Sequence, residues 1–131
     1  MTTVKRKITL KEGKVDKTLT AEEGWVKTKP VWLVTEEVGA KYGTFGYAEL
    51  PCGSIHEPHT HPNADEVFYV ISGHGTARSG DEVFEINPGD TVFVPHGEPH
   101  YFKNDDENIS LIAVFAYFGA PSLKKAGYER T

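Results

Sequence analysis

Two linked spacings constrain this chain more than any other feature of its sequence. Residues 53–73 have the form Gly-x5-His-x-His-x4-Glu-x6-Gly, and residues 89–104 have the form Gly-x5-Pro-x-Gly-x2-His-x3-Asn. Both patterns put glycine and proline where turns must fall and put imidazoles and a carboxylate between them. Together they predict a metal site inside a β-barrel. The candidate ligands are His59, His61, Glu66 and His100.

The geometry of β-strands explains how these residues can meet. Side chains two positions apart on a strand point to the same face, so His59 and His61 project together. Glu66 follows a turn and shares its face with Phe68, and a carboxylate on such an apolar face is costly to bury unless it meets a cation or a donor. His100 opens a strand later in the chain, and closure of a barrel would carry it back to the other three.

The size and composition of the chain predict one all-β domain. Its 131 residues can bury a core but fall short of the length at which cores divide. Thirteen glycines, eight prolines and 38% hydrophobic residues favour short strands with frequent turns. Strand candidates follow one another from Val31 with no helical period between them, which is typical of an antiparallel sandwich or barrel.

This pattern divides the chain into three parts. We expect residues 31–120 to form the barrel and residues 1–30, which are polar and rich in lysine, to form an N-terminal arm. The remaining residues, 121–131, should form a tail with a short helical turn over Ser122–Ala126, where Gly127 is the stop. A capping pattern at Thr20–Glu23 predicts one further helical turn within the arm.

The types of ligand limit which metal ions the site can bind. Neutral imidazoles and a carboxylate suit Fe, Mn, Ni, Cu, Co or Zn, and no thiolate cluster is available. Four protein ligands leave two positions free in an octahedron, whereas they would close a tetrahedral zinc shell. An open site is therefore more natural with iron, manganese or nickel, where the metal acts as a Lewis acid or a redox partner.

Aromatic residues on the expected strands are candidate walls of a substrate pocket. They are Phe45, Tyr47, Phe68 and Phe102. Tyr47 and Glu49 share one face of the strand candidate Thr44–Leu50, and if that face points inward they could donate or accept a proton. We take these two as candidate catalytic residues.

Three other histidines and the single cysteine are set aside as metal ligands. His56 lies out of phase with His59, while His74 and His96 occupy tight turns where exposure is the default. Cys52 stands beside Gly53 and is expected to be structural. A chain with one cysteine forms no internal disulfide, which fits a reducing compartment.

Charge and hydropathy argue against two classes of partner. Fourteen basic and nineteen acidic residues give a net charge of −5, which offers no positive surface to nucleic acid. The nearly apolar run over residues 111–118 is too short to cross a bilayer, and the N-terminal residues lack the apolar stretch of a signal peptide. We therefore expect a cytoplasmic protein whose partner is a small molecule, with neither nucleic acid nor a membrane involved.

The two spacings resemble, position for position, the paired motifs of the cupin superfamily. The resemblance implies a double-stranded β-helix, or jelly-roll barrel, with a divalent metal on the four candidate ligands. The chain looks like the small prokaryotic single-domain cupins, which usually pair as homodimers. The region of Trp25 and Val31–Trp32 is then the candidate for an exchanged or packed strand.

The resemblance leaves the activity open, because one fold hosts many reactions. The leading hypothesis is an Fe(II)-type dioxygenase acting on a small organic molecule. The alternative is a non-redox metalloenzyme (isomerase, lyase or polyketide cyclase) with Tyr47, Glu49 or His56 as proton carrier. A third possibility is a non-catalytic protein that binds or senses a small molecule or a sugar.

Overall fold

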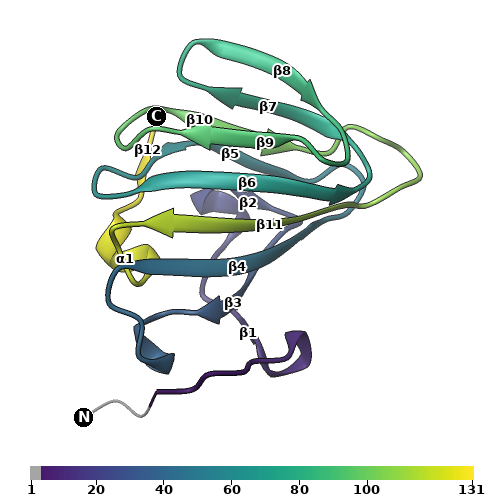
Figure 1. Ribbon diagram of the computed structural model, residues 1–131. Helices are drawn as coiled ribbons and strands as arrows, with labels where there is room; N and C mark the ends of the chain where they lie inside the picture. Colours follow the sequence, from purple (N-terminus) through teal and green to yellow (C-terminus); the bar gives the residue numbers. More distant parts are fainter. Residues whose placement is uncertain (1–3) are drawn as a thin grey trace.

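The computed structural model describes residues 4–131 as two antiparallel sheets with one short α-helix (Figure 1). The strands are β1 (Lys14–Val15), β2 (Trp25–Val26), β3 (Pro30–Val34), β4 (Gly43–Leu50), β5 (Ile55–Thr60), β6 (Asp65–Ser72), β7 (Gly75–Ser79), β8 (Glu82–Ile86), β9 (Thr91–Val94), β10 (His100–Lys103), β11 (Leu111–Phe118) and β12 (Glu129–Arg130). The helices are the 3-10 turns η1 (Leu10–Glu12), η2 (Ala21–Glu23) and η3 (Glu36–Val38), and α1 (Leu123–Ala126).

The order of the strands is that of a jelly roll. One sheet runs β1-β3-β4-β11-β6-β9, and the other runs β12-β5-β10-β7-β8 with β2 also paired to β5. Every pairing is antiparallel, and most neighbours in a sheet are far apart along the chain. The expected double-stranded β-helix is confirmed.

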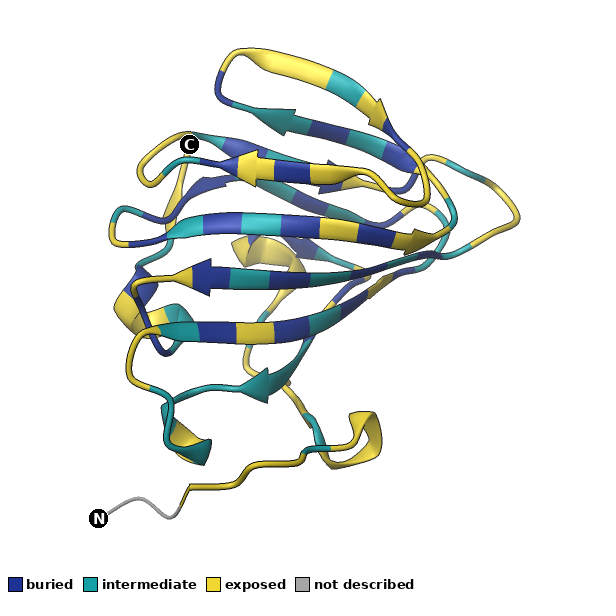
Figure 2. Cartoon of the chain, in the orientation of Figure 1, coloured by how far each residue is buried: buried dark blue, intermediate teal, exposed yellow. Residues whose placement is uncertain are grey.

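Alternation of buried and exposed residues along the strands places the core between the two sheets (Figure 2). In β11 the buried residues are Leu111, Ala113, Phe115 and Tyr117, every second position, as the pleat of a strand requires. The core cluster draws on both sheets and includes Phe68 and Phe102, whose rings stack with their centroids 3.9 Å apart.

Two strands within residues 4–30 join the sheets of the barrel, so this segment is more closely associated with the barrel than the expected arm. β1 pairs with β3 in one sheet, and β2 pairs with β5 in the other. Trp25 is only 5% exposed, and Trp32 packs against Phe115 with their ring centroids 5.7 Å apart. Both indoles therefore pack within their own chain, and the role of this region as an exchanged or packed strand of a dimer stays a prediction.

The predicted helical turns are present. η2 is capped by Thr20 and ends at Gly24, and α1 is capped by Ser122 and ends at Gly127. After α1, β12 returns to pair with β5, so the last residues of the chain join the sheet that carries the histidines. Within residues 4–131, no helix has the length and apolar character needed to cross a membrane.

Candidate metal centre

Both sheets contribute to one cluster of buried ligand atoms. His59 lies near the end of β5, His61 directly follows that strand, and His100 opens β10, where it stands opposite His59. Glu66 comes from β6 in the facing sheet. One ligand atom from each of the four residues lies within 4.8 Å of the others, and all four side chains are buried. The four predicted ligands are thus brought together.

Backbone carbonyls fix the orientation of each imidazole. The Nδ1–H of His59 donates to the carbonyl of Glu57 at 2.6 Å, and that of His100 donates to Glu98 at 3.1 Å. The Nδ1–H of His61 donates to the carbonyl of Gly127 at 2.7 Å. A carbonyl only accepts, so each Nδ1 must carry the proton, and a neutral ring then presents a lone pair at Nε2.

The inward atoms are all electron-rich. Nε2 of His59 and of His61 are buried without a hydrogen-bond partner, and Nε2 of His100 lies 3.0 Å from Oε1 of Glu66. Nε2 of His61 is also 3.2 Å from this oxygen, although the angle does not make a hydrogen bond. Converging lone pairs and a carboxylate in a dry interior repel one another unless a cation lies between them. A divalent transition metal fits this set, because neutral imidazole and carboxylate are its ordinary ligands.

The surroundings of His59 and Glu66 favour the protonation states in which these two groups can bind a metal. Burial, reinforced by the neighbouring His56, lowers the pKa of His59 well below its usual value, so the ring is neutral. Burial by itself would raise the pKa of Glu66, but the hydrogen bonds and charges that His100 and His61 supply when their Nε2 atoms carry protons outweigh that effect and leave the pKa lowered in the metal-free protein. The carboxyl group is therefore ionised.

A column of rings leads from β2 to the ligand His59. The indole of Trp25 stacks on His56 with centroids 3.6 Å apart, and His56 stacks on His59 at 3.8 Å. The hydroxyl of Tyr128 donates to the carbonyl of Glu23 at 2.7 Å and accepts from Nε2–H of His56 at 3.2 Å. His56 is not among the four clustered residues, as predicted. It is buried between Trp25 and His59 and does not lie on the surface.

An irregularity in β5 explains the position of His56. His100 stands opposite His59 and Phe102 stands opposite His56, so β5 has one more residue than β10 over this stretch. Such a bulge shifts the alternation by one position. His56 and His59, three apart in sequence, therefore both face inward, which strict alternation would forbid.

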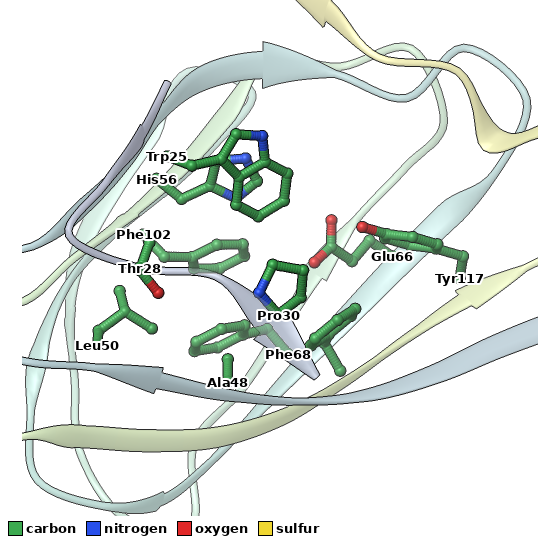
Figure 3. A pocket seen from close by; sticks show the side chains of 11 residues that line it. Trp25, Thr28, Pro30, Ala48, Leu50, His56, Glu66, Phe68, Phe102 and Tyr117 are labelled. Atoms are coloured by element: carbon green, nitrogen blue, oxygen red, sulfur yellow. The ribbon is translucent and has the colours of Figure 1, made fainter. Parts of the chain in front are cut away.

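An aromatic cavity adjoins the cluster (Figure 3). Its walls include Trp25, Glu66, Phe68, Phe102, Phe115 and Tyr117, and it encloses about 30 Å³. Phe68 and Phe102 thus line the cavity where the sequence placed them. The cavity reaches Glu66, so a molecule held between the aromatic walls would lie beside the proposed metal.

Three predicted pocket or catalytic residues lie on the opposite face of β4. Phe45 is 38% exposed, Glu49 is exposed, and Tyr47 is half-buried, whereas Thr44, Gly46, Ala48 and Leu50 are buried. A Cβ at Gly46 would overlap the ring of Phe115, so only a residue without a side chain fits inside at that position. The prediction of Tyr47 and Glu49 as catalytic residues and of Phe45 as a pocket wall is corrected accordingly.

Tyr117 occupies the position beside the ligands that Tyr47 was expected to fill. It stands directly opposite Glu66 across β11 and β6, and its ring lies 4.7 Å from that of His61. In Figure 3 its hydroxyl points toward the Glu66 carboxylate. Burial, and then the charge of Glu66, raise the pKa of Tyr117 well above its usual value, so the phenol keeps its proton. No sequence pattern pointed to this residue, because β11 is apolar on both faces.

The remaining histidines that were set aside lie outside the cluster. His74 pairs with Asp106 at 2.6 Å, and His96 lies 3.3 Å from Asp65; both side chains are exposed. Cys52 is half-buried and unpaired.

Acidification is expected to destabilise the metal-free protein below about pH 6.5. Burial lowers the pKa of His56 and His59 in the folded chain, whereas imidazoles in an unfolded chain titrate near 6.5. Below that pH the unfolded chain therefore binds more protons, and the stability present above it is lost as the pH falls toward the folded pKa values. Urea midpoints of the EDTA-treated protein, measured between about pH 8 and 5, test this. A midpoint that is constant or rises on acidification would contradict it.

Comparison with known proteins identifies the shared part of the chain. Residues 46–116 match the family described as "Cupin domain". Tetracenomycin polyketide synthase protein TcmJ of Streptomyces glaucescens is 32% identical over 55% of this chain and 48% of its own. Acireductone dioxygenase of Exiguobacterium sibiricum is 39% identical over 42% of this chain and 34% of its own. The chain therefore spans about half or less of the length of these relatives.

Among solved structures, the polyketide cyclase RemF from Streptomyces resistomycificus has the same architecture. It superposes with a TM-score of 0.75 over 98% of this chain and 86% of its own, at 20% identity. Identity this low establishes the common fold and nothing about the reaction.

Proposed function

Because the chain belongs to the cupin family, whose domain matches more than half of it, we propose that it is a metal-dependent enzyme acting on a small organic molecule. The convergence of three buried Nε2 atoms and one carboxylate beside an aromatic cavity carries this proposal. The leading form is an Fe(II)-type dioxygenase, a class that the similarity to acireductone dioxygenase also supports. The working compartment that we propose is the cytoplasm.

Each part of the site has a task in such a reaction. His59, His61, Glu66 and His100 would hold the metal, and the carbonyl partners of the three rings would keep them aimed at it. When bound, the metal would supply Lewis-acid or redox chemistry at the positions that these residues leave free. The aromatic walls exclude water, and the Tyr117 hydroxyl can donate a hydrogen bond to an oxygen of the substrate.

The alternative is a non-redox metalloenzyme, such as an isomerase, a lyase or a polyketide cyclase. It is favoured by the similarity to TcmJ and by a phenol that stays protonated beside the ligands. Tyr47 and Glu49 face away from the site and are no longer candidates for the proton carrier. Tyr117 and His56 face the site and are the candidates in this structure. A protein that binds or senses its ligand without turnover remains the third candidate.

Oxygen consumption separates these functions. Protein purified without a nickel column and reconstituted with Fe(II) is expected to consume oxygen with a substrate from a panel of diols, diketones and thiols, in proportion to bound iron. EDTA-treated and Mn(II)-loaded protein are the controls. Turnover that persists without oxygen would support the non-redox alternative. Protein that retains no transition metal under any loading condition would falsify both.

We also propose that the protein is a homodimer joined through the outer face of the sheet β1-β3-β4-β11-β6-β9. The register aligns two rows of apolar side chains across its strands. One row is Val31, Tyr47, Val114 and Tyr69; the other is Val34, Phe45, Ala116, Val67 and Phe93. Antiparallel sheets that face water normally carry polar residues there, and apolar areas of this extent mark interfaces. Neither row contains a charged residue, and a two-fold axis near the central strand β11 would set each row against its copy.

A charge at the centre of this face tests the dimer. Val114→Lys is expected to convert the dimer to a monomer at micromolar concentration, because it would bury two unpaired ammonium groups near the axis. Val83→Lys, on β8 of the other sheet and 59% exposed in the wild type, should leave the dimer intact. Analytical ultracentrifugation measures both. A wild-type protein that sediments as a monomer contradicts the proposal.

A further inference from the structure

The three imidazoles of the cluster are not all oriented in the same way. His59 and His100 each donate from Nδ1 to the carbonyl of the residue two positions earlier, so their partners are local. The acceptor for His61 is the carbonyl of Gly127, 66 residues further along the chain. The direction in which His61 points therefore depends on a separate segment, residues 127–131, being docked beside it.

The backbone of Gly127 lies unusually close to this ligand. Its φ of +84° and ψ of 154° fall in a region that is essentially confined to glycine, and such conformations cluster at functional sites. A Cβ at this position would lie 2.8 Å from two ring carbons of Pro62, the residue after His61. The contact between the two segments is thus too close for a residue with a side chain at position 127.

Two side chains tie the 127–131 segment to η2. The hydroxyl of Tyr128 donates to the carbonyl of Glu23 at 2.7 Å, and Nη1–H of Arg130 donates to the carbonyl of Glu22 at 2.8 Å. η2 is followed directly by β2, which lines the aromatic cavity. The same short segment therefore contacts one candidate ligand and holds one wall of the cavity in place.

Arg130 also reaches the partner of a second candidate ligand. Its Nη2–H donates to the carboxylate of Glu57 at 3.1 Å, and the backbone carbonyl of Glu57 is the acceptor for His59. The side chains of Arg130 and Glu57 are 41% and 31% exposed. An ion pair exposed to this extent adds little to the stability of a fold, so the effect of losing it should appear at the ligands.

We propose that Tyr128 and Arg130 are positioning residues of the metal centre, which hold the Gly127 carbonyl against His61 and thereby raise the affinity of the site for its metal. This inference rests on the proposed function, because the four clustered residues must bind a metal. When the segment is undocked, Nδ1–H of His61 has no acceptor, and the ring can rotate or carry its proton at Nε2, where it is no longer a ligand. Metal binding and docking of the segment are then coupled, and each favours the other by the same factor.

A double variant tests the two positioning residues. Tyr128→Phe combined with Arg130→Ala removes the three hydrogen bonds and keeps the aromatic ring that stacks on His59. It is expected to lower Co(II) affinity about ten-fold, within the 10–100-fold loss that is usual for outer-shell partners of metal ligands. Competition with a chelator measures the affinity, and urea midpoints of the metal-free proteins show separately any change in stability.

The matched control makes the same two changes away from the cluster. Tyr42 is 82% exposed and Arg6 is exposed, so Tyr42→Phe combined with Arg6→Ala should bind Co(II) like the wild type. Circular dichroism verifies that both double variants fold.

Hydrogen exchange of the wild type is a second measurement that needs no variant. Saturating Co(II) is expected to slow exchange of the amides of residues 128–131 about ten-fold, because coupling acts equally in both directions. Exchange in β8, which contributes none of the four clustered residues, should change little.

The outcomes separate the two proposals. Wild-type protein that takes up no Co(II) overturns the proposed function and this inference with it. Wild-type protein that takes up Co(II) without slower exchange in residues 128–131 overturns the inference alone. A folded Tyr128→Phe/Arg130→Ala variant with wild-type affinity does the same, and if that variant does not fold, the exchange measurement decides.

Discussion

Glu66→Gln is expected to lower metal affinity by more than about 100-fold. Loss of outer-shell partners of metal ligands already costs 10–100-fold, and this change removes the only negative charge in the cluster. At a fixed excess of free metal, a 100-fold weaker affinity removes about 2.7 kcal/mol of the stability that metal binding adds. The melting temperature in the presence of metal should therefore fall toward that of the EDTA-treated wild type. Isothermal titration with a competing chelator and calorimetry measure the two effects.

Glu49→Gln is the matched control for this change. It makes the same substitution on the outer face of β4, where the carboxylate is exposed. Metal affinity and the metal-dependent rise in melting temperature should both be those of the wild type. If the two variants lose metal equally, or if Glu66→Gln retains the wild-type affinity, the assignment of Glu66 as a ligand is wrong.

Gly73→Ala is expected to lower the free energy of unfolding by about 3 to 4 kcal/mol. Gly73 links β6 to β7 with φ of +78°, a conformation that costs an alanine roughly 1–2 kcal/mol. An added Cβ would also press on the backbone of Ser110 and Leu111, including the Ser110 carbonyl oxygen, which cannot move without disturbing the start of β11. Urea denaturation of the metal-free protein measures the difference without a contribution from metal.

Gly89→Ala separates the two parts of that cost. Gly89 has φ of +91°, but a Cβ there would meet no atom within 4 Å. Its variant should therefore lose only the conformational part, about 1–2 kcal/mol. Equal losses at the two positions would show that the close approach at Gly73 contributes nothing.

The fold and the convergence of the four candidate metal ligands were predictable because the motif residues are tied to local backbone geometry. His59, His61, Glu66 and His100 stand at fixed distances from turn residues, and those turns set the register that brings the four together. Gly73 is one of these turn residues, and its left-handed conformation and close backbone contact both require glycine. Short-range constraints of this kind can be recognised in a single sequence.

The side chains around the candidate ligands could not be predicted, because their positions depend on tertiary packing that no local sequence pattern indicates. β4 presents its small residues inward because Phe115 fills the space over Gly46, so the larger Tyr47 and Glu49 face outward. In β11 both faces are apolar, and alternation therefore carries no sign of which side holds Tyr117. The phase of His56 depends on an extra residue in β5 that only the pairing with β10 reveals.

The two ends of the chain meet at the strand that carries His59. β2 and β12 both pair with β5, and Gly127 orients the ring of His61. The segment shared with the cupin family covers residues 46–116, so Trp25, Tyr117 and Gly127 all lie beyond it. Relatives that share only this segment would have the candidate ligand positions in common, and we expect their flanks to differ with the compound that each one accepts. Sequence variation in these flanks is where diversification of specificity within this lineage should be sought.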